Sequence, residues 1–168
     1  LALDGIRSLF NAGSIIRTCE AAGFSSVILD CLPPGGDGPL KKTAMDADQW
    51  IRMEQTPDLG ETLLKKKDQG YTLVGVETVQ GSLSYDRRPW QDRTVLVLGN
   101  EEYGIGSHIM GICHEFVTIP MRGVKNSINV ANAASVVCFH VANALFRARK
   151  QGNGQESDSD STSRMSRT

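Results

Sequence analysis

The feature that most limits the fold of this chain is a series of short apolar runs that alternate with helix-like segments. The runs at residues 71–76 and 94–98 show no clean alternation of polar and apolar side chains, which is typical of strands covered on both faces of a parallel sheet. Such strands alternating with helices predict a single α/β domain whose sheet is mostly parallel and flanked by helices. The runs occupy residues 27–29, 71–76, 94–98 and 116–119.

Helix signals lie between these runs. One helix is expected from Asn11, as its N-cap, to Gly23, and a second from Thr56, as its N-cap, to Gly70. A longer helix-compatible segment covers residues 129–149. Ligands of parallel sheets bind beyond the carboxyl ends of the strands, so the loops that follow the runs are the expected site.

Composition separates a folded part from a tail. Residues 150–168 consist largely of Ser, Asp, Gly, Asn and Gln, and they carry too little apolar surface to offset their ordering entropy. We therefore expect a domain over residues 1–149 and a polar, disordered tail over residues 150–168. The Pro- and Gly-rich segment 33–39 predicts a loop.

The sequence also limits the cellular compartment expected for the protein and the metal sites that it can form. We find no apolar run near the roughly 20 residues that span a bilayer and no leader-like start, so a cytoplasmic protein without a membrane partner is expected; what precedes Leu1 is left open. The cysteines have no C-x-x-C spacing, which favours reduced thiols and no metal site. They are Cys19, Cys31, Cys113 and Cys138.

The first motif is N-x-G-x-x-x-R, from Asn11 to Arg17. If Asn11 caps the helix, both side chains can reach its N-terminal end, where a permanently charged guanidinium and outward-pointing N–H groups form an anion site. The alternative is a helix cap beside a surface arginine.

The second motif, L-G-N-E-E-Y-G-I at residues 98–105, follows an apolar run directly. Its glycines allow a ligand to approach the backbone closely, but the spacing is not that of a dinucleotide or phosphate loop. Two consecutive carboxylates, Glu101 and Glu102, suit a ligand with a cationic or hydroxyl-bearing part. The alternative is a polar turn between a strand and a helix.

The third motif is I-P-M-x-G-x-x-x-S-x-N-V-A at residues 119–131, which leads from a strand end through a loop into a helix. Ser127 and Asn129 are both helix-cap residue types, and we expect one to cap and the other to be solvated. Arg122 and Lys125 add a small positive patch.

In this order and spacing, the three motifs resemble those of the SpoU (TrmH-type) branch of the SPOUT RNA methyltransferases, over about residues 1–149. The chain departs from the family pattern at Lys125-Asn126, where members often carry an acidic residue, and at Asn132, where a small residue is common. These departures concern the identity of the substrate more than the reaction.

The resemblance implies a deep C-terminal trefoil knot that holds S-adenosylmethionine, a homodimer formed through the long last helix, and no metal. Its implied partner is RNA, with transfer RNA the first expectation and ribosomal RNA the second. The implied cofactor-binding residues are Leu98, Gly99, Asn100, Gly104, Ile119, Met121, Ser127 and Ile128.

The implied reaction is methyl transfer to a ribose 2′-hydroxyl. A guanidinium has no free acceptor, so we expect Arg17 to clamp the target phosphate and stabilise the developing alkoxide, and the proton acceptor is left unidentified. Asn11, Glu101, Ser127 and Asn129 would orient Arg17 and the ribose, and Glu101 is expected to pair with Arg17 in the empty enzyme. Whether Arg17 acts in its own chain or across the dimer is left open.

RNA contacts are expected from Arg7, Arg17, Arg122 and Lys125. Residues 1–150 carry equal numbers of acidic and basic side chains, so no global field attracts RNA. RNA binding is therefore predicted to be weak, salt-sensitive and dependent on the dimer.

Two alternatives remain from the sequence. One is a base methyltransferase of the same superfamily, and the other is a non-catalytic RNA-binding dimer with the same fold. Trp50 and Trp90 are predicted to be packing residues and not base-stacking platforms.

Overall fold

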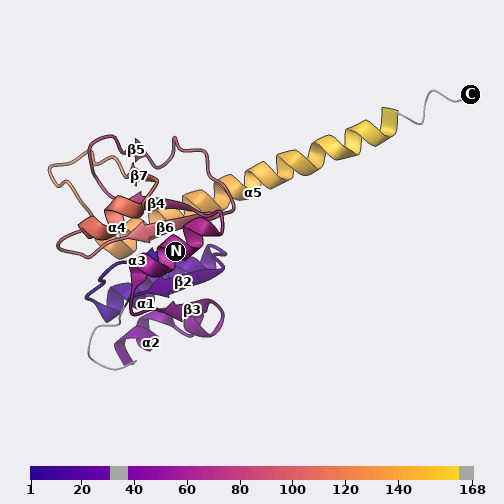
Figure 1. Ribbon diagram of the computed structural model, residues 1–168. Coiled ribbons are helices and arrows are strands. Elements are labelled where there is room, and N and C mark those ends of the chain that lie inside the picture. Colours follow the sequence, from indigo (N-terminus) through magenta and orange to yellow (C-terminus); the bar gives the residue numbers. More distant parts are fainter. Residues whose placement is uncertain (31–37, 163–168) are drawn as a thin grey trace, which may run out of the picture.

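The computed structural model describes the backbone of residues 1–30 and 38–162 and the side chains of residues 1–30 and 38–151. Its centre is a seven-stranded sheet in the order β3-β2-β1-β6-β4-β7-β5, in which every pair of neighbouring strands is parallel (Figure 1). The predicted α/β class is therefore confirmed. The strands are β1 (Ala2–Leu3), β2 (Ser26–Leu29), β3 (Arg52–Gln55), β4 (Thr72–Val76), β5 (Leu83–Ser84), β6 (Thr94–Leu98) and β7 (Glu115–Thr118).

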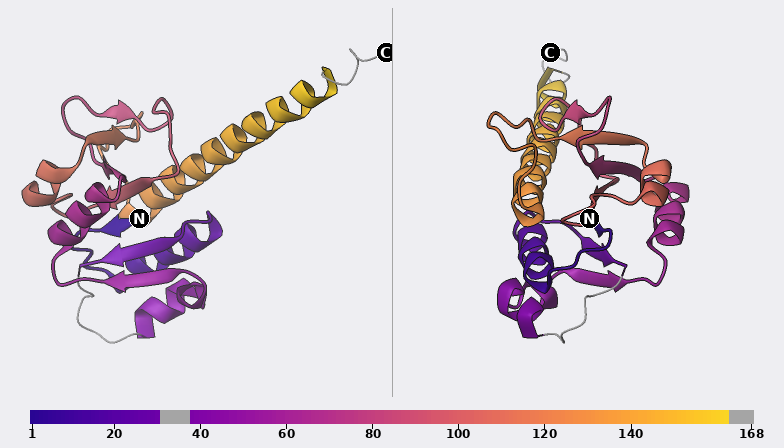
Figure 2. Two further views of the ribbon diagram at one scale, coloured as in Figure 1. Left: turned by 45° about the vertical axis from the view of Figure 1, so that its right-hand side comes forward. Right: turned by 90° about the vertical axis from the view of Figure 1, so that its left-hand side faces the viewer.

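Helices cover both faces of the sheet. Figure 2 shows α1, α2 and α5 on one face and α3 and α4 on the other. Each layer encloses its own cluster of buried apolar side chains, so the strands are buried from both sides, as a parallel sheet requires. The helices are α1 (Leu9–Ala21), α2 (Gly38–Ala44), the 3-10 helix η1 (Ala47–Gln49), α3 (Leu59–Asp68), α4 (Ser107–Ile112) and α5 (Val130–Thr162).

The strand register brings three strand ends together. Leu3 of β1 pairs with Leu98 of β6, Gly75 of β4 with Val97 of β6, and Val76 of β4 with Val117 of β7. The loops that follow β4, β6 and β7 consequently leave the same edge of the sheet.

Two predicted helix starts are wrong by a few residues. Helix α1 begins after Ser8, whose Oγ accepts the N–H of Asn11 at 3.3 Å, so Asn11 lies in the first turn and is not the cap. Helix α3 begins after Asp58, whose Oδ1 accepts the N–H of Glu61 at 2.8 Å, in place of Thr56. In both cases a second residue of a capping type lies near the predicted cap, and its side chain is the one that accepts a free N–H at the start of the helix.

The predicted C-terminal ends of α1 and α3 are confirmed. Gly23 and Gly70 follow α1 and α3 with φ of +78° and +82°, the left-handed conformation that glycine adopts without strain. Asn129 caps α5, because its Oδ1 accepts the N–H of Ala131 at 2.9 Å, and Ser127 is exposed. One of the two candidates thus caps and the other is solvated, as expected.

Several elements had no counterpart in the prediction. Strands β1 and β5 have two residues each, too few for any pattern, and β3 has no fully buried residue. Helix α2 begins at Gly38, within the end of the predicted loop 33–39, and the rest of that loop lies outside the described residues, as does Cys31. The other three cysteines are free thiols.

Helix α5 does not end at the predicted domain boundary. Its backbone is helical through Thr162. The division into a domain over residues 1–149 and a polar tail over residues 150–168 stays a prediction. Residues 163–168 of that tail lie outside the described residues. By length and mean hydropathy, Val130–Gln151 is also apolar enough to cross a membrane, although its inner face is buried against the sheet and α1.

The two tryptophans differ. Trp90 is 9% exposed, and its Nε1 donates to the Tyr85 carbonyl at 3.1 Å, which confirms a packing role. Trp50 is 80% exposed, so the same prediction is wrong there. Its neighbours Ala47 and Ile51 take the buried positions at this turn.

Candidate active site

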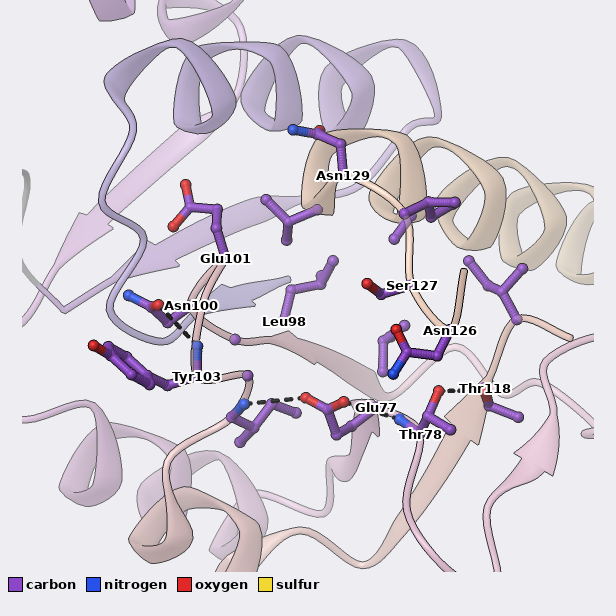
Figure 3. Close-up of a pocket in the computed structure, with 18 of the residues that line it drawn as sticks. Glu77, Thr78, Leu98, Asn100, Glu101, Tyr103, Thr118, Asn126, Ser127 and Asn129 are labelled. Atoms are coloured by element: carbon purple, nitrogen blue, oxygen red, sulfur yellow. Dashed lines mark hydrogen bonds between the residues drawn. The ribbon is translucent and has the colours of Figure 1, made fainter. Parts of the chain in front are cut away.

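A cavity of about 820 Å³ opens at the carboxyl ends of β4, β6 and β7 (Figure 3). Three loops line it: residues 76–79 after β4, residues 98–105 after β6, and a segment between residues 118 and 130 that leads into α5. This is the edge of the sheet at which the sequence predicted a ligand site. All eight residues expected to bind the cofactor lie on its walls, namely Leu98, Gly99, Asn100, Gly104, Ile119, Met121, Ser127 and Ile128.

The loop after β6 folds tightly back on itself. Asn100 and Gly104 exchange two backbone hydrogen bonds of 2.9 Å, and Gly104 has a φ of +71°. A Cβ at Gly99 would lie 2.1 Å from the Gly104 carbonyl carbon and 2.2 Å from the Ile105 nitrogen. Glycine is therefore required at residue 99 by a close approach of two backbone segments.

The side chain of Asn100 fixes this loop. Its Nδ2 donates to the Gly5 carbonyl at 2.6 Å, and its Oδ1 accepts the N–H of Glu102 at 2.8 Å. The side-chain amide of Asn100 therefore ties this loop to the segment that follows β1.

Glu101 directs its carboxylate to the start of α1. It accepts the N–H of Arg7 at 3.0 Å, the N–H of Ser8 at 3.1 Å and the side-chain amide of Asn11 at 2.9 Å. Partial burial raises the pKa of Glu101, but these hydrogen bonds outweigh it and hold the pKa below its ordinary value. The expected pairing of Glu101 with Arg17 is wrong, because these donors at the N-terminus of α1 take the carboxylate.

Asn11 and Asn129 continue this contact to the third loop. The Asn129 Nδ2 donates to the Asn11 Oδ1 at 3.2 Å while the Asn129 Oδ1 caps α5. The chain of hydrogen bonds Glu101–Asn11–Asn129 therefore joins one residue from each of the three motifs at the rim of the cavity. Each of these side chains orients the next.

Arg17 lies apart from this group. It is six residues beyond Asn11, about 9 Å further along the α1 axis and about 240° around it. Its Nη1 donates to the Met45 sulfur at 2.9 Å, it is exposed, and it is not among the residues that line the cavity. The expectation that Asn11 and Arg17 meet at one helix end is wrong, because six residues of helix separate the two side chains along and around the axis wherever the helix begins.

The basic residues expected to bind RNA are spread out. Lys125 lines the cavity, whereas Arg122 is exposed on the same loop outside it. Arg7 forms an ion pair with Glu102 at 2.5 Å, with both side chains largely exposed. Of the four, only Lys125 lines the cavity.

Several cavity residues were missed because they belong to no motif. Glu77 follows β4, and its Oε2 accepts the N–H of Ile105 at 3.2 Å while its Oε1 accepts the N–H of Thr78 at 3.0 Å. The Thr78 and Thr118 hydroxyls are 2.8 Å apart. The signal that would have found them is topological, because β4 lies between β6 and β7.

The lining suits a nucleoside-type ligand. The volume is within the usual range of small-molecule sites, apolar side chains such as Leu98, Ile119 and Ile128 supply a surface for a flat ring, and the glycines expose backbone groups. Within the described parts of the chain, no group of three or more His, Cys, Asp or Glu side chains is placed to hold a metal ion.

The sequence over residues 1–139 matches the SpoU rRNA Methylase family. A tRNA (guanosine(18)-2′-O)-methyltransferase of Thermus thermophilus is 25% identical over 146 residues, which is 87% of this chain and 75% of that protein. A Putative TrmH family tRNA/rRNA methyltransferase of Staphylococcus saprophyticus is 33% identical over 153 residues, which is 89% of this chain and 58% of that one. The mouse tRNA (guanosine(18)-2′-O)-methyltransferase TARBP1 is 30% identical over 81% of this chain but only 8% of its own length.

Solved structures have the same fold. The Aquifex aeolicus TrmH/SpoU tRNA modifying enzyme superposes with a TM-score of 0.78 at 23% identity, covering 88% of this chain and 75% of that one. The AdoMet-bound rRNA methyltransferase of Sinorhizobium meliloti superposes with a TM-score of 0.79 at 26% identity, covering 86% of this chain and 55% of that one. The sheet and its helical layers are therefore shared with known methyltransferases.

Proposed function

The chain belongs to the SpoU rRNA methylase family, and from this premise we propose that it transfers a methyl group from S-adenosylmethionine to a ribose 2′-hydroxyl of RNA. The observation that carries the proposal is the meeting of all three motifs at one cavity. The hydrogen bonds Glu101–Asn11 and Asn11–Asn129 join the motifs, and the loops of two of them form most of its wall.

The donor side of the reaction is assigned to the cavity. Leu98, Gly99 and Ile119 and the segment Ser127–Ile128 would hold the nucleoside through apolar contact and backbone groups. When bound, S-adenosylmethionine supplies a methyl group already activated on a sulfonium. The protein's task is then to hold the reacting oxygen in line at near-attack distance, which is the function we give to the network of Glu101, Asn11 and Asn129. The family's trefoil knot is part of the proposal.

The acceptor side is assigned to Arg17 of a second copy. Arg17 is exposed and stands outside the cavity of its own chain, so a neighbouring chain can receive it. Helix α5 supports a homodimer, because Val136, Phe139 and Phe146 leave apolar surface exposed along it. The Arg17 guanidinium would bind the target phosphate and stabilise the alkoxide as it develops, but it cannot accept the proton.

We propose transfer RNA as the substrate class, with ribosomal RNA second. The support is that several relatives, including those of Thermus thermophilus and mouse, are named tRNA (guanosine(18)-2′-O)-methyltransferases. Because the folded part is neutral, productive RNA binding would depend on the two Arg17 and two Lys125 side chains that a dimer brings together.

The test is incubation of the protein with labelled S-adenosylmethionine and fractionated cellular RNA, followed by mass spectrometry of the released nucleosides. The expected product is a nucleoside with one added methyl on the ribose and an unchanged base. Methyl on the base would indicate a base methyltransferase instead. Binding of RNA without any transfer would indicate a non-catalytic RNA-binding dimer.

A further inference from the structure

We infer that Glu77 determines specificity at this site: its carboxylate makes the cavity bind the cationic methyl donor more tightly than the neutral thioether product. The inference rests on the proposed function and goes beyond it, since Glu77 lies in none of the three motifs. It concerns the charge of one side chain on the cavity wall.

The position of Glu77 is fixed by the neighbouring loop after β6. Its carboxylate accepts two backbone N–H groups, one from Thr78 beside it and one from Ile105 of that loop (Figure 3). A Cβ at Gly104 would lie 2.3 Å from the Glu77 Oε2, so the absence of a side chain at Gly104 makes room for this carboxylate. Glu77 is half-buried and is held at the cavity wall.

The charge of Glu77 is compensated less than that of the other carboxylates. Glu77, Glu101 and Glu102 all line the cavity. Glu102 is paired with Arg7 at 2.5 Å, and Glu101 is held by three donors at the start of α1. Glu77 accepts backbone N–H groups, and no ion pair involves it in the described part of the chain.

Other charges near the cavity do not cancel this one. Among the described residues that line it, Lys125 is the one cation, and it stands on the segment that leads into α5, away from β4. The cavity wall after β4 therefore presents a net negative charge to whatever binds beside it.

The methyl donor and its product differ in the charge at their sulfur atom, and a nearby carboxylate interacts with that charge. S-adenosylmethionine carries a sulfonium, and the product S-adenosylhomocysteine carries a neutral thioether, while the rest of the two molecules is the same. A carboxylate several ångströms away in a partly water-excluded cavity favours the cation by roughly three- to ten-fold in affinity. The same preference speeds release of the product.

The experiment is titration calorimetry of the full chain with S-adenosylmethionine and, separately, with S-adenosylhomocysteine. We expect the ratio of the two dissociation constants to fall by roughly three- to ten-fold in Glu77→Gln, which removes the charge with little change of shape. Glu77→Asp keeps the charge and should keep most of the ratio. The matched control is the double variant Arg7→Gln with Glu102→Gln, because it removes a paired positive and negative charge beside the same cavity and leaves the net charge unchanged.

If Glu77 only held the loop in place, Glu77→Gln would weaken the binding of both ligands equally and leave the ratio of their dissociation constants unchanged. That result would overturn the inference. The inference would also be overturned if the ratio fell as far in Glu77→Asp, or in the double variant of Arg7 and Glu102, as in Glu77→Gln. If Glu77→Gln does not fold, the wild-type chain still tests whether the cavity prefers a cationic ligand. It should bind sinefungin, which carries an amine in place of the sulfonium, like S-adenosylmethionine, and equal affinity for all three ligands contradicts the inference. Failure to bind any of them would instead contradict the proposed function.

Discussion

The cavity wall and the face of α1 that carries Arg17 are built in different ways. The cavity loops are fixed by backbone pairs, a glycine contact that excludes any side chain, and hydrogen bonds between the three motifs. The Arg17 guanidinium is exposed and contacts the sulfur of an exposed methionine, Met45. This difference is what we expect if one chain completes the methyl-donor site and a second copy supplies Arg17 to the acceptor site, as proposed above.

Backbone strain also differs between the cavity wall and the region around Arg17. The left-handed position in the cavity loop is a glycine, Gly104, which adopts it at little cost. Beside Arg17, the left-handed positions are Met45 and Asp46, with φ of 49° and 66°, which cost about 1–3 kcal/mol each. The cavity is thus relaxed as one chain folds, whereas the turn that contacts Arg17 is held in a strained form.

The largest expected effect comes from filling the glycine contact in the cavity. Gly99→Ala places a Cβ 2.1 Å from the Gly104 carbonyl carbon, so the loop 98–105 must move. We expect S-adenosylmethionine to bind roughly 100-fold more weakly by calorimetry, because a displacement of this size removes several backbone contacts at once. Gly123→Ala is the control, since nothing lies within 4 Å of its Cβ. Unchanged binding by Gly99→Ala would show that the loop is not part of the donor site.

A smaller effect is expected from breaking the network that links the motifs. Asn11→Ala removes the hydrogen bonds to both Glu101 and Asn129. We expect kcat for RNA methylation to fall roughly ten-fold while the affinity for S-adenosylmethionine changes less than about two-fold, because Asn11 positions groups at the rim and does not line the cavity. Glu20→Ala, on an exposed part of the same helix, is the control. An equal loss in kcat and in cofactor affinity would place Asn11 in the donor site itself.

The smallest effect concerns acid stability. Because the folded-state pKa of Glu101 lies below its ordinary value of 4.5, its stabilising contribution is present above pH 4.5 and is lost as the pH falls through the folded-state pKa. Urea unfolding should therefore show a shallower loss of stability below pH 4.5 in Glu101→Gln than in the wild type. Parallel pH profiles would mean that the bonds from Arg7, Ser8 and Asn11 do not hold the ionised form.

The sequence predicted the cavity-lining motif residues correctly and the position of the Arg17 side chain incorrectly, and the reason is physical. The glycines, Pro120 and the cap Asn129 act through local backbone geometry, which short spacing records. Arg17 lies about 9 Å further along α1 than Asn11 and about 240° around it, and the packing of α1 decides which of its faces meets the cavity, which no local pattern contains. Glu77 was missed because strand order, which no local pattern contains, brings it to the site.

The most direct measurement mixes two inactive variants, Arg17→Ala and Gly99→Ala, by co-expression, and assays RNA methylation. If Arg17 serves the partner's cavity, each mixed dimer holds one intact site, formed by Arg17 of one chain and the cavity of the other. Random mixing then predicts roughly a quarter of the wild-type activity, while each variant alone stays near background. Activity that stays at background in the mixture would contradict the account, because it would place Arg17 and the cavity that it serves in the same chain.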